Sequence, residues 1–234
     1  MERYHELSAA AMVRGTALET GIPALPTELL TCPLEQLTSG DIAELIAAGQ
    51  AAELKLYHFK QKGLLPRVRA VLGFLKGVQP ESLLDVGSGR GVFLLPFLEE
   101  FPWVPVTSVD LLPHRVEMLR RMAAGGISHL TALQQDICRW DLPEASFDVV
   151  TLLEVLEHIP DVSQAVTAAV RLARRYVVVT VPSKPDNNPE HIHLLTKDIL
   201  TDLFTRVGCT RLNFSGVPGH LVLIAHVGKH DTTH

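Results

Sequence analysis

Residues 83–91 read Leu-Leu-Asp-Val-Gly-Ser-Gly-Arg-Gly, and this stretch decides the fold. An apolar run containing a carboxylate leads into three glycines at alternate positions, and a helix is expected from Val92 to Glu100. Glycine lets the backbone turn sharply and lets a ligand approach closely, so the stretch predicts a strand, a ligand-binding turn and a helix. In the dinucleotide pattern G-x-G-x-x-G the third glycine would stand at position 92, which is Val92. The pattern is therefore G-x-G-x-G, which differs from a nicotinamide-binding loop.

Short apolar runs alternate with helical stretches from residue 81 onward. Such runs are typical of strands buried on both faces of a parallel sheet, with crossover helices between them. Near the end of the chain, two further runs are separated by only four residues, which predicts an antiparallel hairpin. We therefore expect an α/β fold, a doubly wound, Rossmann-like and mostly parallel seven-stranded sheet ending in an antiparallel hairpin. The expected strands are Ser82–Val86, Val104–Val109, Ile127–Gln134, Phe147–Leu153, Tyr176–Val181, Arg211–Ser215 and His220–His226.

The residues before this sheet show helical patterns and no strand signal. Thr38 is expected to cap a helix that runs on to about Gly63, and a second helix is expected from Leu65 to Leu75. We predict an N-terminal helical extension (1–64), the sheet domain (65–228) and a short tail (229–234). Three arginines, Arg171, Arg174 and Arg175, are expected on the solvated face of a helix.

The composition excludes several classes of protein. The 234 residues are 47% hydrophobic and 20% charged, which is normal for a globular protein and excludes wholesale disorder. The formal net charge of -5 disfavours nucleic acid as a bulk electrostatic partner. The three cysteines form no C-x-x-C, so neither a disulfide framework nor a zinc knuckle is predicted. No apolar run is long enough to cross a membrane and no secretory signal is evident, so we expect a cytoplasmic protein.

Acidic residues accompany three successive strands. Asp85 stands at the mouth of the glycine loop, where it would repel a pyrophosphate but attract a ligand with an ammonium and a sulfonium group. Asp110 follows the second strand, in the place where a carboxylate accepts hydrogen bonds from both ribose hydroxyls. Asp136 follows the third strand, where a carboxylate can accept from an adenine amino group.

Taken together, these motifs resemble those of the class I S-adenosylmethionine-dependent methyltransferases, over about residues 65–228. The stretches that carry the resemblance are LLDVGSGRG, VTSVD, QQDI, FDVV and LEVLEHIPD. The chain departs from many members in lacking a Lys-Pro-Gly-Gly turn before the fifth strand. The resemblance implies S-adenosylmethionine as cofactor. It assigns the methionine portion to Asp85, Gly87, Ser88, Gly89 and Gly91, the ribose to Asp110, the adenine face to Leu111 and the adenine edge to Asp136 and Ile137, with Glu154 as a further cofactor contact.

A carboxylate–histidine cluster follows the fourth strand. Glu154, Glu157 and His158 stand at i, i+3 and i+4, so on a helical turn all three would face the same way. With His191 they make an oxygen/nitrogen set that suits a divalent metal. This arrangement resembles the small-RNA 3′-terminal 2′-O-methyltransferases and the ubiquinone-pathway O-methyltransferases. Ordinary class I members without a metal also carry a Leu-Glu-His-Ile/Val-Pro segment, and we favour this metal-free interpretation, with His158 and Glu157 as the catalytic residues.

We therefore expect a methyltransferase that acts on a small molecule at oxygen or nitrogen, without a nucleic-acid or membrane partner. Two alternatives stay open. One is a metal-dependent O-methyltransferase whose divalent ion is held by Glu154, Glu157, His158 and His191; the other is a cofactor-binding module without catalysis. The sequence does not identify the methyl acceptor, the atom methylated or the oligomeric state, because the acceptor side of such a fold is built from variable segments.

Overall fold

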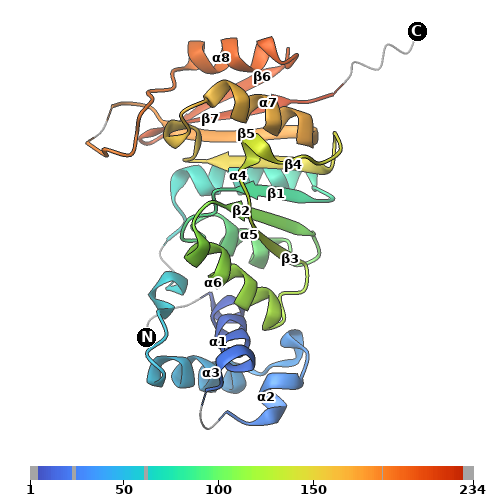
Figure 1. The fold of residues 1–234 in the computed structure, drawn as a ribbon, viewed down its shortest axis with the longest axis vertical. Coiled ribbons are helices and arrows are strands. Elements are labelled where there is room, and N and C mark those ends of the chain that lie inside the picture. Colours follow the sequence, from blue (N-terminus) through green and yellow to red (C-terminus); the bar gives the residue numbers. More distant parts are fainter. Residues whose placement is uncertain (1–4, 23–24, 61–62, 186, 229–234) are drawn as a thin grey trace. The chain divides into compact units, whose positions relative to one another are not determined.

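The computed structural model describes residues 5–22, 25–60, 63–185 and 187–228. Its strands form one seven-stranded sheet in the order β3-β2-β1-β4-β5-β7-β6 (Figure 1). The pairs β1–β4, β2–β3 and β4–β5 are parallel, whereas β7 runs antiparallel to both β5 and β6. The expected α/β sheet with a terminal antiparallel hairpin is thus confirmed. The strands are β1 (Leu83–Val86), β2 (Val106–Asp110), β3 (Leu130–Gln134), β4 (Phe147–Leu153), β5 (Ala173–Pro182), β6 (Leu212–Val217) and β7 (His220–His226).

The chain folds as two compact units. The first unit contains Met1–Gly63 and Ser88–Gln134, and the second contains Leu64–Gly87 and Gln135–His234. The expected domain boundary at residue 64 stays a prediction, and the expected tail lies outside the described residues.

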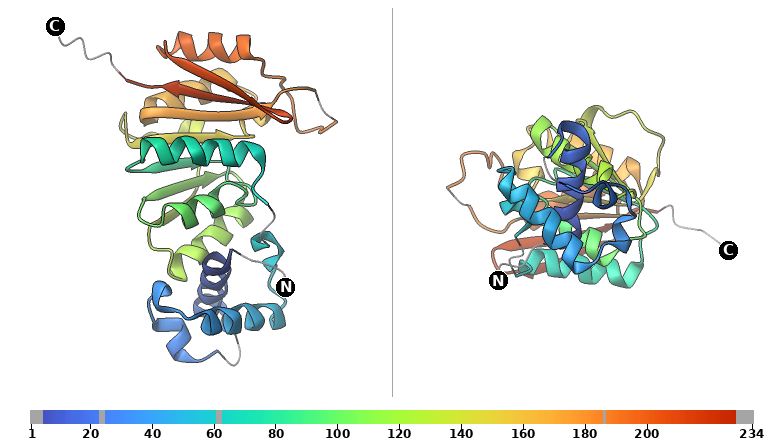
Figure 2. Two further views of the ribbon diagram at one scale, coloured as in Figure 1. Left: turned by 180° about the vertical axis from the view of Figure 1, so that it is seen from behind. Right: turned by 90° about the horizontal axis from the view of Figure 1, so that it is seen from below.

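Close helix packing organises the first unit. Helix α1 (Glu6–Thr20) lies along α6 (Pro113–Ala124), and it also contacts α3 (Ser39–Ala51) (Figure 2). A Cβ atom at Gly15 would lie 1.9 Å from the backbone oxygen of Arg121, so only glycine permits this approach. The remaining helical elements of this unit are α2 (Thr27–Thr31), α5 (Leu94–Glu100) and the 3-10 turns η1 (Leu34–Gln36) and η2 (Leu56–Phe59).

Two helices in this unit differ from the expectation in extent. Thr38 caps α3 as expected, since its Oγ1 accepts from the backbone N–H of Asp41 at 3.2 Å. The helix nevertheless ends at Ala51, because Glu53 adopts a left-handed backbone with φ of 55°. Likewise α5 begins two residues later than expected, because the turn that Gly91 starts takes up residues 91–93.

The second unit holds the other strands and their covering helices. Helix α7 (Val162–Leu172) packs on β4 and β5, and α4 (Pro66–Val78) lies on the opposite face against β6 and β7 (Figures 1 and 2). The 3-10 turns η3 (Ile137–Arg139) and η4 (Leu156–His158) and the helix α8 (Lys197–Arg206) complete it. No helix in the described ranges combines the length and apolarity needed to span a membrane.

The arginines near β5 do not form a solvated helix face, so that expectation is wrong. Arg174 and Arg175 lie within β5 and donate to the carboxylate of Asp148 on β4, which is 1% exposed. Arg171 on α7 donates to the backbone oxygen of Trp140 at 2.7 Å. Arg174 and Arg175 supply the charged partners that the buried carboxylate of Asp148 requires. Arg171 instead links α7 to the backbone at Trp140.

Candidate functional site

The glycine loop follows β1, whose four residues are all buried. Gly87, Gly89 and Gly91 have φ values of 66°, 57° and 75°, which residues with side chains rarely adopt. A Cβ atom at Gly87 would also lie 2.7 Å from Val155 Cγ2. All three glycines are therefore required by the turn itself, and the loop presents bare backbone as a ligand-binding loop must.

Asp85 is the buried carboxylate of β1. It is 2% exposed, and its Oδ1 accepts from the hydroxyl of Thr151 on β4 at 2.7 Å. This hydrogen bond fixes the orientation of the carboxylate just before the loop. No motif in the sequence indicated this role of Thr151.

Asp110 lies at the end of β2 and joins three groups of the first unit. Its Oδ2 accepts from the backbone N–H of Gly89 at 3.3 Å and from Arg115 at 3.4 Å. Its Oδ1 accepts from the backbone N–H of Leu112 at 2.9 Å. The carboxylate thus ties the glycine loop to the start of α6, as the hydroxyls of Ser88 and Ser108 also tie the loop to β2. The side chain of Leu111 next to it is 62% exposed.

Asp136 and Ile137 have structural roles in the second unit. Oδ1 of Asp136 accepts from the backbone N–H of Cys138 at 2.9 Å and so caps η3. Ile137 is 3% exposed and belongs to the core. These contacts account for both residue types, and the expected contact with an adenine edge stays a prediction.

Glu154 does not share a helical face with Glu157 and His158, so that expectation is wrong. The turn η4 begins at Leu156, and Glu154 precedes it with a left-handed backbone, φ 59°. Thr180 on β5 donates from its hydroxyl to Glu154 Oε1 at 2.8 Å, and Nε2 of His220 lies 3.0 Å from Oε2. Arg67 lies 3.9 Å from Oε1.

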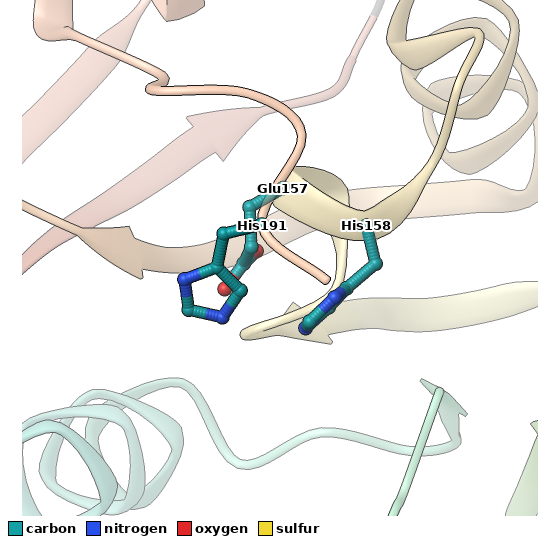
Figure 3. Close-up of side chains that lie close together, drawn as sticks. All are labelled: Glu157, His158 and His191. Atoms are coloured by element: carbon teal, nitrogen blue, oxygen red, sulfur yellow. The ribbon is translucent and has the colours of Figure 1, made fainter. Parts of the chain in front are cut away.

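Three of the four candidate ligands do come together. Glu157, His158 and His191 point toward one another (Figure 3), and one ligand atom from each lies within 4.8 Å of the others. Glu157 is fully buried, and the two imidazole rings meet edge to face with centroids 4.8 Å apart. The backbone N–H of Ile192 donates to the carbonyl of Glu157 at 3.0 Å, which holds the segment around His191 against η4.

The ring of His158 is oriented by a backbone carbonyl. Its Nδ1 lies 2.9 Å from the carbonyl oxygen of Glu190. A carbonyl can only accept, so Nδ1 carries the hydrogen and Nε2 keeps its lone pair. His158 Nε2 can therefore accept a proton or bind a cation.

Sequence reasoning missed the partners of Glu154. Thr180 lies inside an apolar strand, and His220 follows the hairpin turn. Neither belongs to a spaced motif, and the proximity of His220 to Glu154 arises only when β7 pairs with β5. The one available signal was a histidine placed directly after a tight turn.

Comparison with known proteins identifies the domain. A family model described as a methyltransferase domain matches residues 57–213. The chain belongs to this methyltransferase family. A malonyl-[acyl-carrier protein] O-methyltransferase from Geobacter sulfurreducens is 28% identical over 122 residues, 52% of this chain and 45% of the relative. A ubiquinone biosynthesis O-methyltransferase from Pseudomonas fluorescens is 31% identical over 100 residues, 42% of either chain.

A solved structure agrees with the fold of this methyltransferase domain. A methyltransferase from Thermotoga maritima, described as a possible histamine N-methyltransferase, superposes with a TM-score of 0.57 at 14% identity. The match covers 70% of this chain and 89% of that one. The aligned part spans less than half the length of the curated relatives, and the fold alone does not define an acceptor.

Proposed function

We propose that this chain is an S-adenosylmethionine-dependent methyltransferase that acts on a small molecule at oxygen or nitrogen. The observation that carries the proposal is the glycine loop bonded to Asp110: Gly89 donates its backbone N–H to the carboxylate that follows β2. In a chain of the methyltransferase family, this geometry suits a ligand with a ribose beside the loop. The net charge of -5 favours a small acceptor over nucleic acid. The unpaired cysteines favour the reducing cytoplasm.

The residues present fit this cofactor. The three left-handed glycines leave bare backbone for its methionine portion, and the exposed Leu111 offers an apolar surface to adenine. Oδ2 of Asp110 already accepts two hydrogen bonds, whereas Oδ1 accepts one, from Leu112, and can accept a second from a ribose hydroxyl. Asp85, Ser88, Asp136, Ile137 and Glu154 complete the proposed contacts. When bound, the cofactor supplies a methyl group activated by its sulfonium for in-line displacement.

The chain's own contribution is positioning and proton transfer. His158 takes the proton of the acceptor at Nε2, because its Nδ1–H is committed to the carbonyl of Glu190. The buried carboxylate of Glu157 stabilises the imidazolium that this transfer creates. Holding the acceptor in line supplies much of the remaining acceleration.

Calorimetry tests the cofactor assignment directly. We expect S-adenosylmethionine and its demethylated product to bind, and NAD not to bind. Binding of NAD alone would overturn the proposal. A panel of small hydroxylated and amino compounds with methyl-labelled cofactor then tests transfer, and His158→Gln should lose most of it while retaining cofactor affinity. Binding without transfer to any compound would favour a non-catalytic module.

A metal-dependent O-methyltransferase is the second candidate, and the convergence of Glu157, His158 and His191 favours it. A divalent ion there would orient two hydroxyls of an acceptor and make one easier to deprotonate. Glu154 is not in this set, because its carboxylate contacts Thr180 and His220. Titration with Mn²⁺ alone should show one site that His191→Ala abolishes. Absence of saturable Mn²⁺ and Zn²⁺ binding would remove this candidate.

A further inference from the structure

The turn between β6 and β7 contacts two loops that follow other strands of the second unit. Gly219 accepts from the backbone N–H of Ser183, directly after β5, at 3.0 Å. His220 brings its Nε2 to 3.0 Å from Oε2 of Glu154, directly after β4. Both side chains in the second contact are about four-fifths buried, at 22% and 20% exposure. The turn therefore contacts the first residue of the loop after β4 and the first residue of the loop after β5.

These two loops also bond to each other and carry the carboxylate–histidine cluster. Ile192 and His193 donate their backbone N–H groups to the carbonyl of Glu157, at 3.0 and 3.3 Å. The ring of His193 lies 3.1 Å from the carbonyl of Ile159. Glu157 belongs to the loop after β4, and His191 belongs to the loop after β5. The relative position of the cluster members thus depends on how both loops are held.

Glu154 is held in a conformation that its own backbone disfavours. A left-handed φ of 59° is uncommon for a residue with a side chain, and it persists only where surrounding contacts impose it. Three contacts hold Glu154 in this conformation. Its backbone N–H donates to the carbonyl of Thr180 at 2.9 Å, and its carboxylate contacts the hydroxyl of Thr180 and the imidazole of His220. Arg67 adds a positive charge at 3.9 Å. Nδ1 of His220 lies 3.1 Å from the carbonyl of Pro218. Because a carbonyl and a carboxylate both only accept, each ring nitrogen of His220 carries a hydrogen in this arrangement.

We propose that His220 is a positioning residue of the acceptor side: through its N–H contact with Glu154 it holds both loops so that Glu157, His158 and His191 stay together. The term acceptor side rests on the proposed function. The contacts of the hairpin turn with the two loops do not depend on that function. His220 contacts Glu154 and the carbonyl of Pro218, and it acts on the loops through its contact with Glu154.

Amide hydrogen exchange measured by NMR on the full chain tests this proposal. The reporters are the backbone N–H groups of Glu154, Ser183, Ile192 and His193, whose partners are known. The matched variants are His220→Gln and His220→Asn, which carry the same amide. The Gln amide nitrogen reaches the position of Nε2 and the Asn amide nitrogen does not. We expect His220→Asn to speed exchange at all four reporters by about tenfold, and His220→Gln to stay close to wild type.

Two controls separate this outcome from general loosening. His226→Asn changes a histidine at the other end of β7, beside Tyr176, and should leave the reporters unchanged. Thr180→Val removes the hydroxyl that donates to Glu154 Oε1 and should speed exchange at Glu154 more than at Ser183. Equal exchange in the Gln and Asn variants, or unchanged exchange at Ile192 and His193 in His220→Asn, would overturn the proposal. Calorimetry with S-adenosylmethionine is a separate measurement. A failure of cofactor binding would count against the proposed function, whereas the role of His220 is decided by the exchange data alone.

Discussion

At the scale of single residues, Asp110 allows a direct test of the cofactor site. Asp110→Ala removes the proposed ribose acceptor, and we expect a loss of about 1.5–3 kcal/mol in S-adenosylmethionine binding, measured by calorimetry. The same change deprives Gly89 and Leu112 of their hydrogen-bond acceptor. Thermal melting without cofactor therefore has to accompany the titration. Unchanged affinity in a folded variant would show the ribose assignment to be wrong.

Cys138 is expected to be a slow thiol. Burial, helped by the nearby carboxylate of Asp136, raises the pKa of Cys138 to about 11. Because the thiolate is the reactive form, alkylation by iodoacetamide at pH 7.5 should be on the order of a hundredfold slower than for a free cysteine. Peptide mass spectrometry measures the labelling, with protein unfolded in guanidinium as the reference. Asp136→Asn should increase the rate, and equal labelling in folded and unfolded protein would contradict the expectation.

Residue spacing predicted the glycine loop well and the acidic cluster only in part. The loop's pattern and the aspartate after β2 predicted a shared ligand site, which stays a prediction; the bond from Gly89 to Asp110 shows that the two groups lie side by side. The spacing of Glu154 to His158 implied a common face only if the backbone were helical. A single left-handed residue removes Glu154 from that face. Its partner His220 lies far along the chain, and no local pattern encodes such a contact.

At the scale of elements, the buried carboxylate of Asp148 joins β4 to β5 by pairing with two half-exposed guanidinium groups. Its carboxylate accepts from Arg174 at 3.0 Å and from Arg175 at 2.9 Å. Asp148→Ala should lower the free energy of unfolding by about 1–3 kcal/mol, because the backbone N–H of Glu81 loses its acceptor, whereas the two half-exposed guanidinium groups stay solvated. Arg206→Ala, which breaks the exposed pair with Asp202, should cost no more than about 0.5 kcal/mol. Urea denaturation measures both, and similar midpoints for the two variants would refute the assignment.

The sheet was predictable because its strands are continuous apolar runs, and each expected strand has a counterpart within a few residues. Element ends were less predictable. Helix α3 stops two residues before the left-handed Glu53, and α4 ends at Val78, directly before the left-handed Gln79. Neither residue is a typical terminator, so the ends are set by backbone geometry that tertiary packing imposes.

At the scale of the whole molecule, the proposed class of acceptor rests on the net charge more than on any single motif. A net charge of -5 gives a field that opposes polyphosphates, and the three arginines expected on a solvated helix face are bound to Asp148 and to backbone carbonyls. They are therefore not available as a binding surface. This pairing is the structural reason to place small molecules ahead of nucleic acid in the acceptor screen.

The stability of the whole molecule depends on pH through its partly buried histidines. Burial is the first cause that lowers the pKa of His58, His129 and His226 from the ordinary 6.5. A lowered histidine pKa means that the unfolded chain binds more protons than the folded chain, so stability rises with pH. The contribution is fully present above about pH 6.5 and is lost as pH falls through the lower folded values.

We therefore expect the melting temperature at fixed ionic strength to fall between pH 7.5 and pH 5, as measured by calorimetry. Hydrogen bonds with Thr38 lower the pKa of Asp41, so protonation of Asp41 also reduces stability, but only below about pH 4. The range from pH 7.5 to pH 5 therefore isolates the effect of the histidines. His129 has a buried Nε2 without a hydrogen-bond partner, which makes it the best single test. His129→Gln should flatten the pH dependence in part, because the variant has no group there to protonate. A flat wild-type profile, or one that His129→Gln steepens, would show that burial of these imidazoles does not set acid stability.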